Sequence, residues 1–363
     1  MNSIIQIATR KSPLALWQAH TTQKLLIDMG LSVEIFPVVT TGDKMQKSQL
    51  ADVHLNSAEP NHLSTGKGLF IKEIQEALLA KQAHVAVHSM KDLPVTQTEG
   101  LSVAAVLPRA AARDVLILSP MVLEQLGLNN KSEGELKNLT FTKLKASLLA
   151  CDKFCENIIG TTSTRRQLLL RKHLKPDLNL QILRGNVDTR LKRLRNNEFA
   201  AIILAEAGLE RLKLMSYKEM FALPLNLFIP ATAQGVIAVE VAEANQKLKM
   251  QIAQMCCHKT AINAAVERLV LFLLGGDCHS SIGVHFDGDN LFVICGRDGR
   301  TKELNFSINK QELKNMQNIF AKNSYLYSDF FKDICFSESA KKIHNLLIEN
   351  NFADVSDVNL IKF

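Results

Sequence analysis

Short apolar runs alternate with amphipathic stretches along the first two thirds of the chain. The runs are rich in Ile, Val and Leu and predict strands at residues 4–9, 33–39, 85–87, 157–160, 178–183 and 200–204. Apolar residues at helical spacing predict helices over 14–26, 69–79, 164–174, 187–194 and 206–214. Ser12 followed by Pro13 is a typical helix start. Strands that alternate with helices indicate an α/β fold with mostly parallel sheets.

The pattern changes near residues 256–258. A helix is predicted over 261–274, then strands at 284–286 and 291–295, then a Lys/Asn-rich tail, which together predict a smaller C-terminal α+β domain. Two polar stretches, 48–65 and 120–156, are interpreted as surface excursions. The domains expected are residues 1–107 with 234–255, residues 108–233, and residues 256–363.

Composition narrows the function classes. The 363 residues are 47% hydrophobic and 22% charged, which is typical of a globular chain, and the net charge of +7 favours an anionic partner. Aromatic residues make up only 6%, and there is no long Lys/Arg run, so a small polyanion is favoured over nucleic acid. Because the first residues predict a strand, we expect no secretory leader, and we expect no membrane-spanning run; the seven cysteines are interpreted as reduced thiols. A cytoplasmic location is therefore expected, with no membrane partner.

Basic and hydroxyl side chains follow the ends of several predicted strands. In a parallel sheet these ends share one edge, where helix N-termini also point, so the side chains are expected to form a site for a polyanion. Arginine suits planar carboxylates because it donates bidentately. The residues at these strand ends are Arg10, Lys11, Ser12, Ser89, Lys91, Asp92, Thr161, Thr162, Ser163, Arg165, Arg166, Arg184, Asn186, Arg190 and Arg211.

Two features of this edge need separate interpretation. Arg165 and Arg166 are helix neighbours about 100° apart, so they are not expected to face one ligand group together; they reach two carboxylates, or one holds a domain interface. Asp92 is interpreted as the one carboxylate in this positive neighbourhood. It is either a proton-transfer group or a loop residue that caps a turn.

Cys278 lies in a glycine-flanked loop at residues 275–283. Such a thiol is accessible and nucleophilic if a cation lowers its pKa, and otherwise it is a spare reduced thiol. The pair Cys151 and Cys155 lacks a second pair at zinc-site spacing, so no metal is expected. No glycine-rich phosphate loop opens a helix, so nucleotide binding is not indicated.

Several motifs, in order, resemble the porphobilinogen deaminase family (hydroxymethylbilane synthases). They are IATRKSPLA at 7–15, GKGLF at 66–70, AVHSMKDLP at 86–94, GTTSTRRQ at 160–167, LRGNVDTR at 183–190 and IILAEAGL at 202–209, followed by residues 230–235 and the Cys278 loop. The resemblance covers nearly all of the first 285 residues. It implies two lobes similar to those of periplasmic binding proteins, with the active cleft between them, and a third domain that carries a cofactor.

The resemblance also implies a transferase of tetrapyrrole (heme) biosynthesis. It joins four porphobilinogen molecules head to tail on a dipyrromethane cofactor, releases ammonia, and frees hydroxymethylbilane. Cys278 would carry the cofactor through a thioether, and Asp92 would stabilise cationic pyrroles and move protons. The cofactor would be bound by Ser89, Lys91, Thr161, Thr162, Ser163, Arg165, Arg166, Arg184, Gly185 and Gln234. The substrate would be bound by Arg10, Ser12, Gln18, Lys67, Arg190 and Arg211. The enzyme is expected to be a monomer.

Three departures from the family pattern stand out. Ser281 replaces the proline usual three residues after the cofactor cysteine, Ala233 replaces a glycine, and the chain beyond about residue 297 shows little resemblance. The alternative is a non-catalytic carboxylate-binding protein on the same scaffold. Nucleic-acid binding is supported only by the net charge, and a salt titration would test it.

Overall fold

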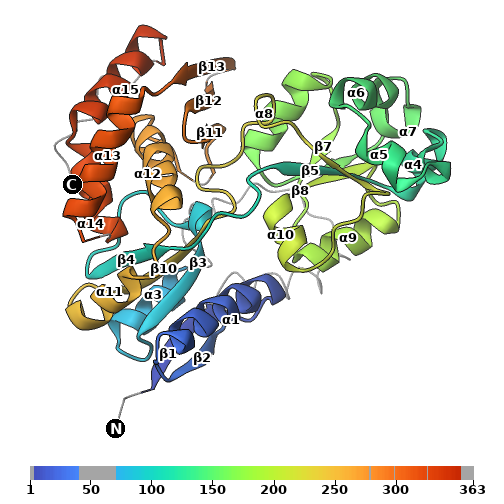
Figure 1. Ribbon diagram of the computed structural model, residues 1–363. Coiled ribbons are helices and arrows are strands. Elements are labelled where there is room, and N and C mark those ends of the chain that lie inside the picture. The colour runs from blue at the N-terminus through green and yellow to red at the C-terminus, as the bar shows by residue number, and fades with distance from the viewer. Residues whose placement is uncertain (1–3, 41–70, 278, 298, 325, 353–363) are drawn as a thin grey trace, which may run out of the picture.

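The computed structural model describes residues 4–40, 71–277, 279–297, 299–324 and 326–352 (Figure 1). Within these residues the strands form two mixed sheets of five strands and one antiparallel sheet of three. We call the parts built on the five-stranded sheets the first and second lobes, and the part built on the three-stranded sheet the C-terminal unit. The predicted Ser48–Thr65 excursion and the sequence positions Lys67 and Cys278 lie outside the described residues.

The first lobe has the strand order β2-β1-β3-β10-β4. Its strands are β1 (Ile5–Arg10), β2 (Val33–Val38), β3 (Val85–Ser89), β4 (Leu101–Val106) and β10 (Ile237–Ala242). Its helical segments are α1 (Pro13–Asp28), α3 (Lys72–Leu79), η1 (Met90–Asp92) and α11 (Gln246–Ala253). Ile7 of β1 packs into the same core as Leu26 of α1, and its neighbour Ala8 packs with Ile74 of α3. Because successive side chains of a strand alternate between faces, the two helices cover opposite faces of the sheet.

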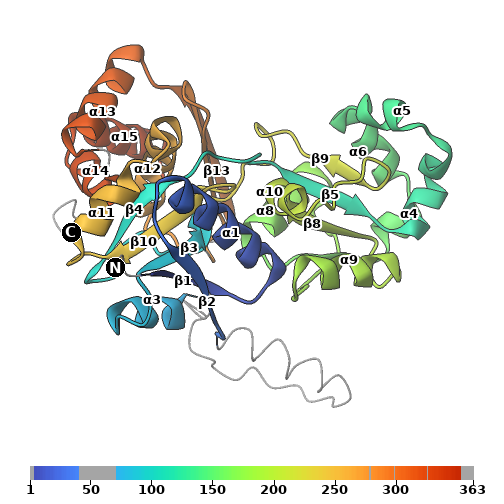
Figure 2. The same cartoon turned by 60° about the horizontal axis from the view of Figure 1, so that its bottom comes forward.

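The second lobe has the strand order β7-β6-β8-β5-β9. Its strands are β5 (Asp114–Leu118), β6 (Ile159–Gly160), β7 (Leu180–Gln181), β8 (Ala201–Ala205) and β9 (Met220–Ala222). Its helical segments are α4 (Pro120–Gln125), η2 (Leu128–Asn130), α5 (Glu133–Lys137), α6 (Phe141–Leu149), α7 (Asp152–Cys155), α8 (Thr164–His173), α9 (Val187–Arg195) and α10 (Glu206–Arg211). Leu116 and Leu118 face one buried cluster, and Val115 and Ile117 face another. Helices therefore cover both faces of this sheet as well (Figures 1 and 2).

One strand in each lobe runs against the others. In the first lobe β10 is antiparallel to both β3 and β4, and in the second lobe β5 is antiparallel to both β8 and β9. The remaining pairs are parallel, so the other strands of each described sheet share one direction. The predicted α/β class is confirmed, and the predominance of one strand direction is confirmed with it. The reversed strands β5 and β10, together with β4, were not predicted.

The C-terminal unit contains an antiparallel sheet and a group of helices. Its elements are α12 (His258–Leu273), β11 (Ile282–Phe286), β12 (Asn290–Arg297), β13 (Arg300–Ser307), α13 (Lys310–Lys322), α14 (Tyr327–Cys335) and α15 (Glu338–Glu349). Nearly every turn of α12 is buried, and residues such as Leu269 share one continuous core with β3, β4 and β10 of the first lobe. The predicted α+β character is confirmed. The three sheets lie inside the three predicted domain ranges, and the domain boundaries themselves stay a prediction.

The stretch 120–156 is not a surface excursion, and that prediction was wrong. It folds into helices α4 to α7, and Leu144, Leu148 and Phe154 are buried in the same cluster as Leu116 of β5. The helical pattern was missed because each of these helices is short and buries only a few apolar side chains among many polar ones. The stretch therefore forms part of the core of the second lobe.

Two adjacent segments connect the lobes, residues 107–113 and 223–236. They are hydrogen-bonded to each other where Ala110 N donates to Gly235 O at 3.1 Å. Gly235 has φ +88°, and a Cβ at this position would lie 2.6 Å from Ala110 O, so glycine is required there. Ala233 has φ +56°, the left-handed region that favours glycine. The glycine that the family pattern has at position 233 would fit this backbone without strain.

Candidate active site where the lobes meet

The ends of β1 and β3 deliver polar groups of the first lobe to the predicted edge. Arg10 ends β1, Ser12 caps α1 by accepting a hydrogen bond from Ala15 N at 3.4 Å, and Ser89 ends β3. Gln18 Nε2 donates to Ser89 Oγ at 2.9 Å, so α1 and β3 are joined at this edge. The structure thus brings these predicted residues of the first lobe together.

Asp92 and Lys91 follow β3 in the short helix η1. Asp92 is exposed, whereas Lys91 is partly buried and its Nζ donates to Gln234 Oε1 at 3.3 Å. Burial lowers the pKa of Lys91 to about 8, although the neighbouring Asp92 carboxylate opposes that shift. At neutral pH Lys91 is still mostly charged, but burial of that charge costs free energy. An anionic ligand next to Lys91 would reduce this cost.

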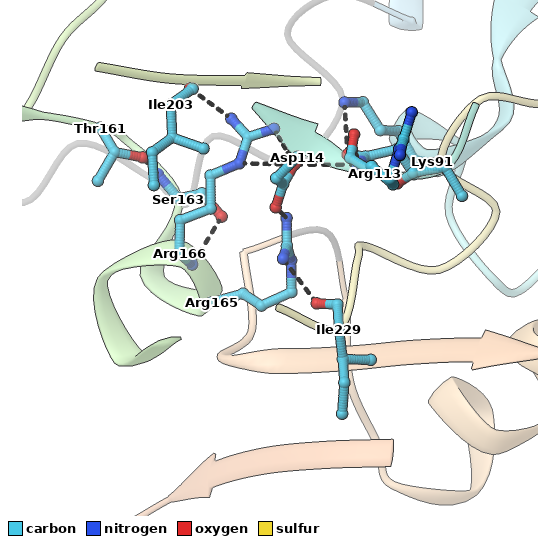
Figure 3. Close-up of polar contacts among 11 residues, drawn as sticks. Lys91, Arg113, Asp114, Thr161, Ser163, Arg165, Arg166, Ile203 and Ile229 are labelled. Carbon is cyan, nitrogen blue, oxygen red and sulfur yellow. Dashed lines mark hydrogen bonds and ion pairs between the residues drawn. The ribbon is translucent and has the colours of Figure 1, made fainter. Parts of the chain in front are cut away.

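In the second lobe, Arg165 and Arg166 share one buried carboxylate (Figure 3). Arg165 Nη2 lies 2.8 Å from Asp114 Oδ2, and Arg166 Nη2 lies 2.7 Å from Asp114 Oδ1. Asp114 has no exposed surface. Both arginines reach this one protein carboxylate because their long side chains converge on a group placed between them; which ligand groups they face stays a prediction. The expectation that Asp92 is the one carboxylate in this positive neighbourhood was wrong.

The charge state of Asp114 follows from its partners. Burial by itself would raise the pKa of the Asp114 carboxyl, but the guanidinium groups of Arg165 and Arg166 outweigh burial and hold this pKa well below its usual range. The carboxylate is therefore ionised at neutral pH. Gln234 Nε2 donates a further hydrogen bond to Asp114 Oδ1 at 2.9 Å. Gln234 thus contacts Asp114 of the second lobe and Lys91 of the first.

The direction of the strands explains why Asp114 was missed. The prediction searched the carboxyl ends of strands, but Asp114 begins β5. Because β5 is reversed, Asp114 pairs with Ala205, the last residue of β8, and so lies at the edge where β8 ends. In the same way Ile237 of β10 pairs with Ser89, the last residue of β3. The local signal that remained available was an acidic residue directly before the apolar run Val115–Leu118.

Arg190 is a partly buried cation and Arg211 is a buried one. Arg190 Nε donates to Gly185 O at 2.7 Å, and Arg211 Nη2 donates to Gly235 O at 2.7 Å while its guanidinium lies 5.5 Å from the centre of the Trp17 ring. Burial lowers the pKa of each to about 10. For Arg190 the other contributor to the shift is the charge of Arg166, not a carboxylate. Such cations are suited to an anionic ligand.

The remaining predicted groups of the second lobe surround the start of α8. Ser163 caps this helix by accepting from Arg166 N at 3.4 Å, Thr161 is buried beside it, and Thr162 is exposed. Arg184 is exposed and Gly185 has φ +114°, in the turn before α9. The structure therefore gathers the described members of the predicted site at one edge of each lobe.

The residues on both sides of position 278 form a hydrogen-bonded turn. Asp277 N donates to Ser280 Oγ at 2.9 Å, and His279 N donates to Asp277 Oδ1 at 3.0 Å. Thr164 Oγ1 of α8 donates to His279 O at 2.6 Å, so the turn is fastened to the helix that carries Arg165 and Arg166. These bonds constrain the loop without the proline that Ser281 replaces.

The donor set fits a cofactor with several carboxylates. Arginine, lysine and hydroxyl donors converge here, and Arg165 Nε is buried without a hydrogen-bond partner among the described residues. A buried unpaired donor is costly, and a ligand oxygen would satisfy it. Lys91, Arg165 and Arg166 are the described residues that would hold carboxylates of such a group, and their binding role stays a prediction.

Sequence comparisons agree with this chemistry. A family model described as "Porphobilinogen deaminase, dipyromethane cofactor binding domain" matches residues 5–250. The chain is 37% identical over 306 residues to the porphobilinogen deaminase of Legionella pneumophila (strain Lens), an alignment that covers 83% of this chain and 85% of that protein.

Solved structures show weaker similarity. The VFT2 domain of BvgS from Bordetella pertussis matches with a TM-score of 0.37 and 12% identity, over 69% of this chain and 84% of that one. A ligand-binding component of an ABC-type import system from Staphylococcus aureus matches with a TM-score of 0.37 and 13% identity, over 74% of this chain and 78% of that one. Similarity this weak carries no argument about function. No helix in the described part of the chain is long and apolar enough to cross a membrane.

Proposed function

The chain belongs to the porphobilinogen deaminase family, and from that premise we propose how its own residues perform the family's reaction. The enzyme deaminates porphobilinogen and joins four molecules head to tail, which yields hydroxymethylbilane for tetrapyrrole biosynthesis. It uses a dipyrromethane cofactor, and when bound this group supplies the pyrrole on which the chain of rings is extended. The residue roles given below are our proposal.

Binding is assigned to the buried and partly buried cations of the site. Each porphobilinogen ring carries an acetate and a propionate, and Lys91, Arg165, Arg166, Arg190 and Arg211 present donors at the lobe edges where such groups would lie. A charge-assisted hydrogen bond contributes about 1.5–3 kcal/mol, so a few of them fix the orientation of a ring. Arg10, Ser12, Gln18, Ser89, Gln234 and the hydroxyls at 161–163 complete the proposed set, together with Arg184, Gly185 and Lys67.

Catalysis is assigned to Asp92. Loss of ammonia leaves positive charge on the substrate pyrrole, and an exposed carboxylate beside Lys91 stabilises that charge and accepts or returns a proton at its Oδ atoms. Asp114 is unsuited to this task because both of its oxygens already accept from arginines. The observation that carries the proposal is this division between an exposed and a buried carboxylate at one site.

Attachment of the cofactor is assigned to Cys278. The turn that flanks it is fastened to α8, next to Arg165 and Arg166. Half-buried Cys155 and Cys257 are free thiols and offer matched controls. The monomeric state and the cytoplasmic location are part of the same proposal.

The test is the intact mass of the purified protein and of two variants. We expect wild type and Cys155→Ala to carry a mass excess equal to two linked pyrrole units, and Cys278→Ala to lack it. Samples without the excess are incubated with porphobilinogen and measured again. If wild type still gains no mass, the chain is a carboxylate-binding protein on this scaffold; if Cys278→Ala carries the excess, the attachment site is wrong.

A further inference from the structure

One buried residue in the site has no assigned role, although four donor atoms converge on it. The Asp114 carboxylate accepts from Arg165 Nη2 at 2.8 Å, Arg166 Nη2 at 2.7 Å, Arg166 Nε at 3.2 Å and Gln234 Nε2 at 2.9 Å. None of the surface of Asp114 is exposed, and Arg165 and Arg166 are only 3% and 8% exposed. No ligand can reach this carboxylate without breaking the cluster.

The cluster fixes the orientation of both guanidinium groups. Arg165 Nη1 donates to Ile229 O at 2.7 Å, and Arg166 Nη1 donates to Ile203 O at 3.0 Å (Figure 3). Each guanidinium group therefore donates both to a backbone carbonyl and to the Asp114 carboxylate, and these two contacts fix its orientation. The donor left over on Arg165 is Nε, which is buried and unpaired among the described residues.

The same cluster is connected to the first lobe through Gln234 and to the C-terminal unit through the segment of Ile229. Gln234 accepts from Lys91 Nζ and donates to Asp114, which joins the first lobe to the second. Ile229 lies next to Pro230, whose carbonyl accepts a hydrogen bond from Val284 N of the C-terminal unit at 3.1 Å. Asp114 is therefore bonded, directly or through one residue, to groups that belong to both lobes.

The charges indicate what this arrangement does. Lys91, Arg165 and Arg166 bring three positive charges close together, and Asp114 is the buried negative charge among them. Without it the cations would repel one another and turn towards solvent, because burying unpaired like charges is unfavourable. With it they keep fixed directions and a net positive charge.

We propose that Asp114 is a positioning residue of this enzyme: it orients Arg165 and Arg166 and, through Gln234, Lys91, so that ligand carboxylates meet cations that are already aligned. The proposal rests on the binding roles assigned above. Asp114 itself does not touch the substrate or the reacting atoms. Its contribution is preorganisation, which lowers the cost of binding because the cations do not reorganise when a ligand arrives.

The test compares Asp114→Asn with Asp177→Asn, whose carboxylate forms a surface ion pair with Lys175 in the same lobe. Asparagine keeps the shape but removes the charge and presents an NH2 group to the arginines. We expect a reduced cofactor-loaded fraction by intact mass, and a kcat/KM per loaded enzyme that falls about 100-fold, the loss typical of a misplaced site. Asp177→Asn should match wild type in both.

A pH profile separates positioning from a merely structural role. The charged groups that face Lys91 are Asp92 on η1, Asp114 on β5, and Arg165 and Arg166 on α8, with Gln234 as its hydrogen-bond acceptor. The Asp114 charge raises the pKa of Lys91, so its removal makes Lys91 lose its proton at lower pH. The alkaline limb of kcat/KM, which we expect near pH 8 in wild type, should move to lower pH by about one pH unit. Asp114→Glu, which keeps the charge, should restore the limb without restoring full activity.

Two results would overturn the proposal. One is wild-type kcat/KM and loading in Asp114→Asn. The other is a uniform loss of activity with an unmoved alkaline limb, which would make Asp114 a structural residue only. If Asp114→Asn does not fold, Asp114→Glu and Gln234→Met test the proposal instead. Gln234→Met breaks the link between Lys91 and Asp114 and should move the alkaline limb to lower pH. An unmoved limb in Gln234→Met would reject the proposal. Failure of the proposed function itself shows separately, as absence of the mass excess from wild type.

Discussion

In the first lobe Asp92, the carboxylate to which we assign catalysis, is exposed next to a lysine, whereas in the second lobe Asp114 is fully buried between two arginines. Both lie at the same edge of similar sheets, each with one reversed strand. One arrangement leaves a carboxylate free to act on a ligand, and the other uses a carboxylate to hold cations in place. The same scaffold therefore supports two tasks, and burial decides which task a carboxylate can perform.

The lobes also differ in how their hydrophobic cores extend. The core of the first lobe continues through α12 into the C-terminal unit, whereas the second lobe has two separate clusters, one of which includes Ile294 of β12. The first lobe and the C-terminal unit should therefore unfold together, and the second lobe should unfold more independently.

The largest expected effect concerns the exposed carboxylate. Asp92→Asn should lower kcat by about 10²–10⁴-fold, because a proton-transfer and charge-stabilising group is lost. Because Asp92 is exposed, the melting temperature and cofactor mass of this variant should equal those of wild type. Glu99→Gln, an exposed carboxylate change in the same lobe, is the control and should keep full turnover. Normal turnover by Asp92→Asn would remove the functional contrast between the two carboxylates.

A matched pair of core substitutions tests the difference between the cores. Leu269 of α12 and Leu170 of α8 are both fully buried, and each change to alanine should cost about 2–5 kcal/mol of unfolding free energy. Hydrogen exchange should show faster opening of both β10 and the C-terminal helices in Leu269→Ala, and of the second lobe alone in Leu170→Ala. Equal effects over the whole chain in both variants would mean that the cores form one cooperative unit.

The connection between the lobes predicts a smaller loss. Gly235→Ala should destabilise the protein by about 2 kcal/mol, since a left-handed φ costs about 1–2 kcal/mol for alanine and the new Cβ would collide with Ala110 O. Gly30→Ala is the control: Gly30 also has a positive φ, but a Cβ added there would meet no atom within 4 Å, so this variant should lose only the conformational part. Thermal unfolding of both variants measures the difference in stability. Equal losses of stability would show that the backbone at Ala110 shifts to accommodate the new Cβ.

The smallest effect is expected for an exposed ion pair of the second lobe. Arg193 Nε lies 2.7 Å from Glu198 Oε2, and the two side chains are 38% and 42% exposed. Glu198→Gln should change the unfolding free energy by less than about 0.5 kcal/mol, because solvent screens such pairs. Chemical denaturation measures this free energy. A loss as large as that expected for a buried ion pair would contradict the view that burial distinguishes Asp114 from surface carboxylates.

Local sequence patterns determined much of this protein. Hydrophobic periodicity located β1, β2, β3, β6, β7 and β8 and several of the helices, and Ser12 with Pro13 marked the start of α1. The positions after these strands supplied Arg10, Lys91 and Arg166, because the chemistry at the end of a parallel strand can be inferred from neighbours in sequence. The family motifs added Cys278 and the reaction. All of these signals lie within a few residues of one another.

The tertiary structure alone decided which distant residues complete the site. The direction of β5 depends on its pairing with β8 and β9, and that pairing brings Asp114 to the site edge. The position of Gln234 between Lys91 and Asp114 likewise depends on the return of the chain through β10. Strand direction and burial arise from contacts between residues far apart in the sequence, and a single sequence carries no local pattern for them. Periodicity therefore predicted the elements and one edge of the site, while the buried anion that aligns its cations became visible only in the folded chain.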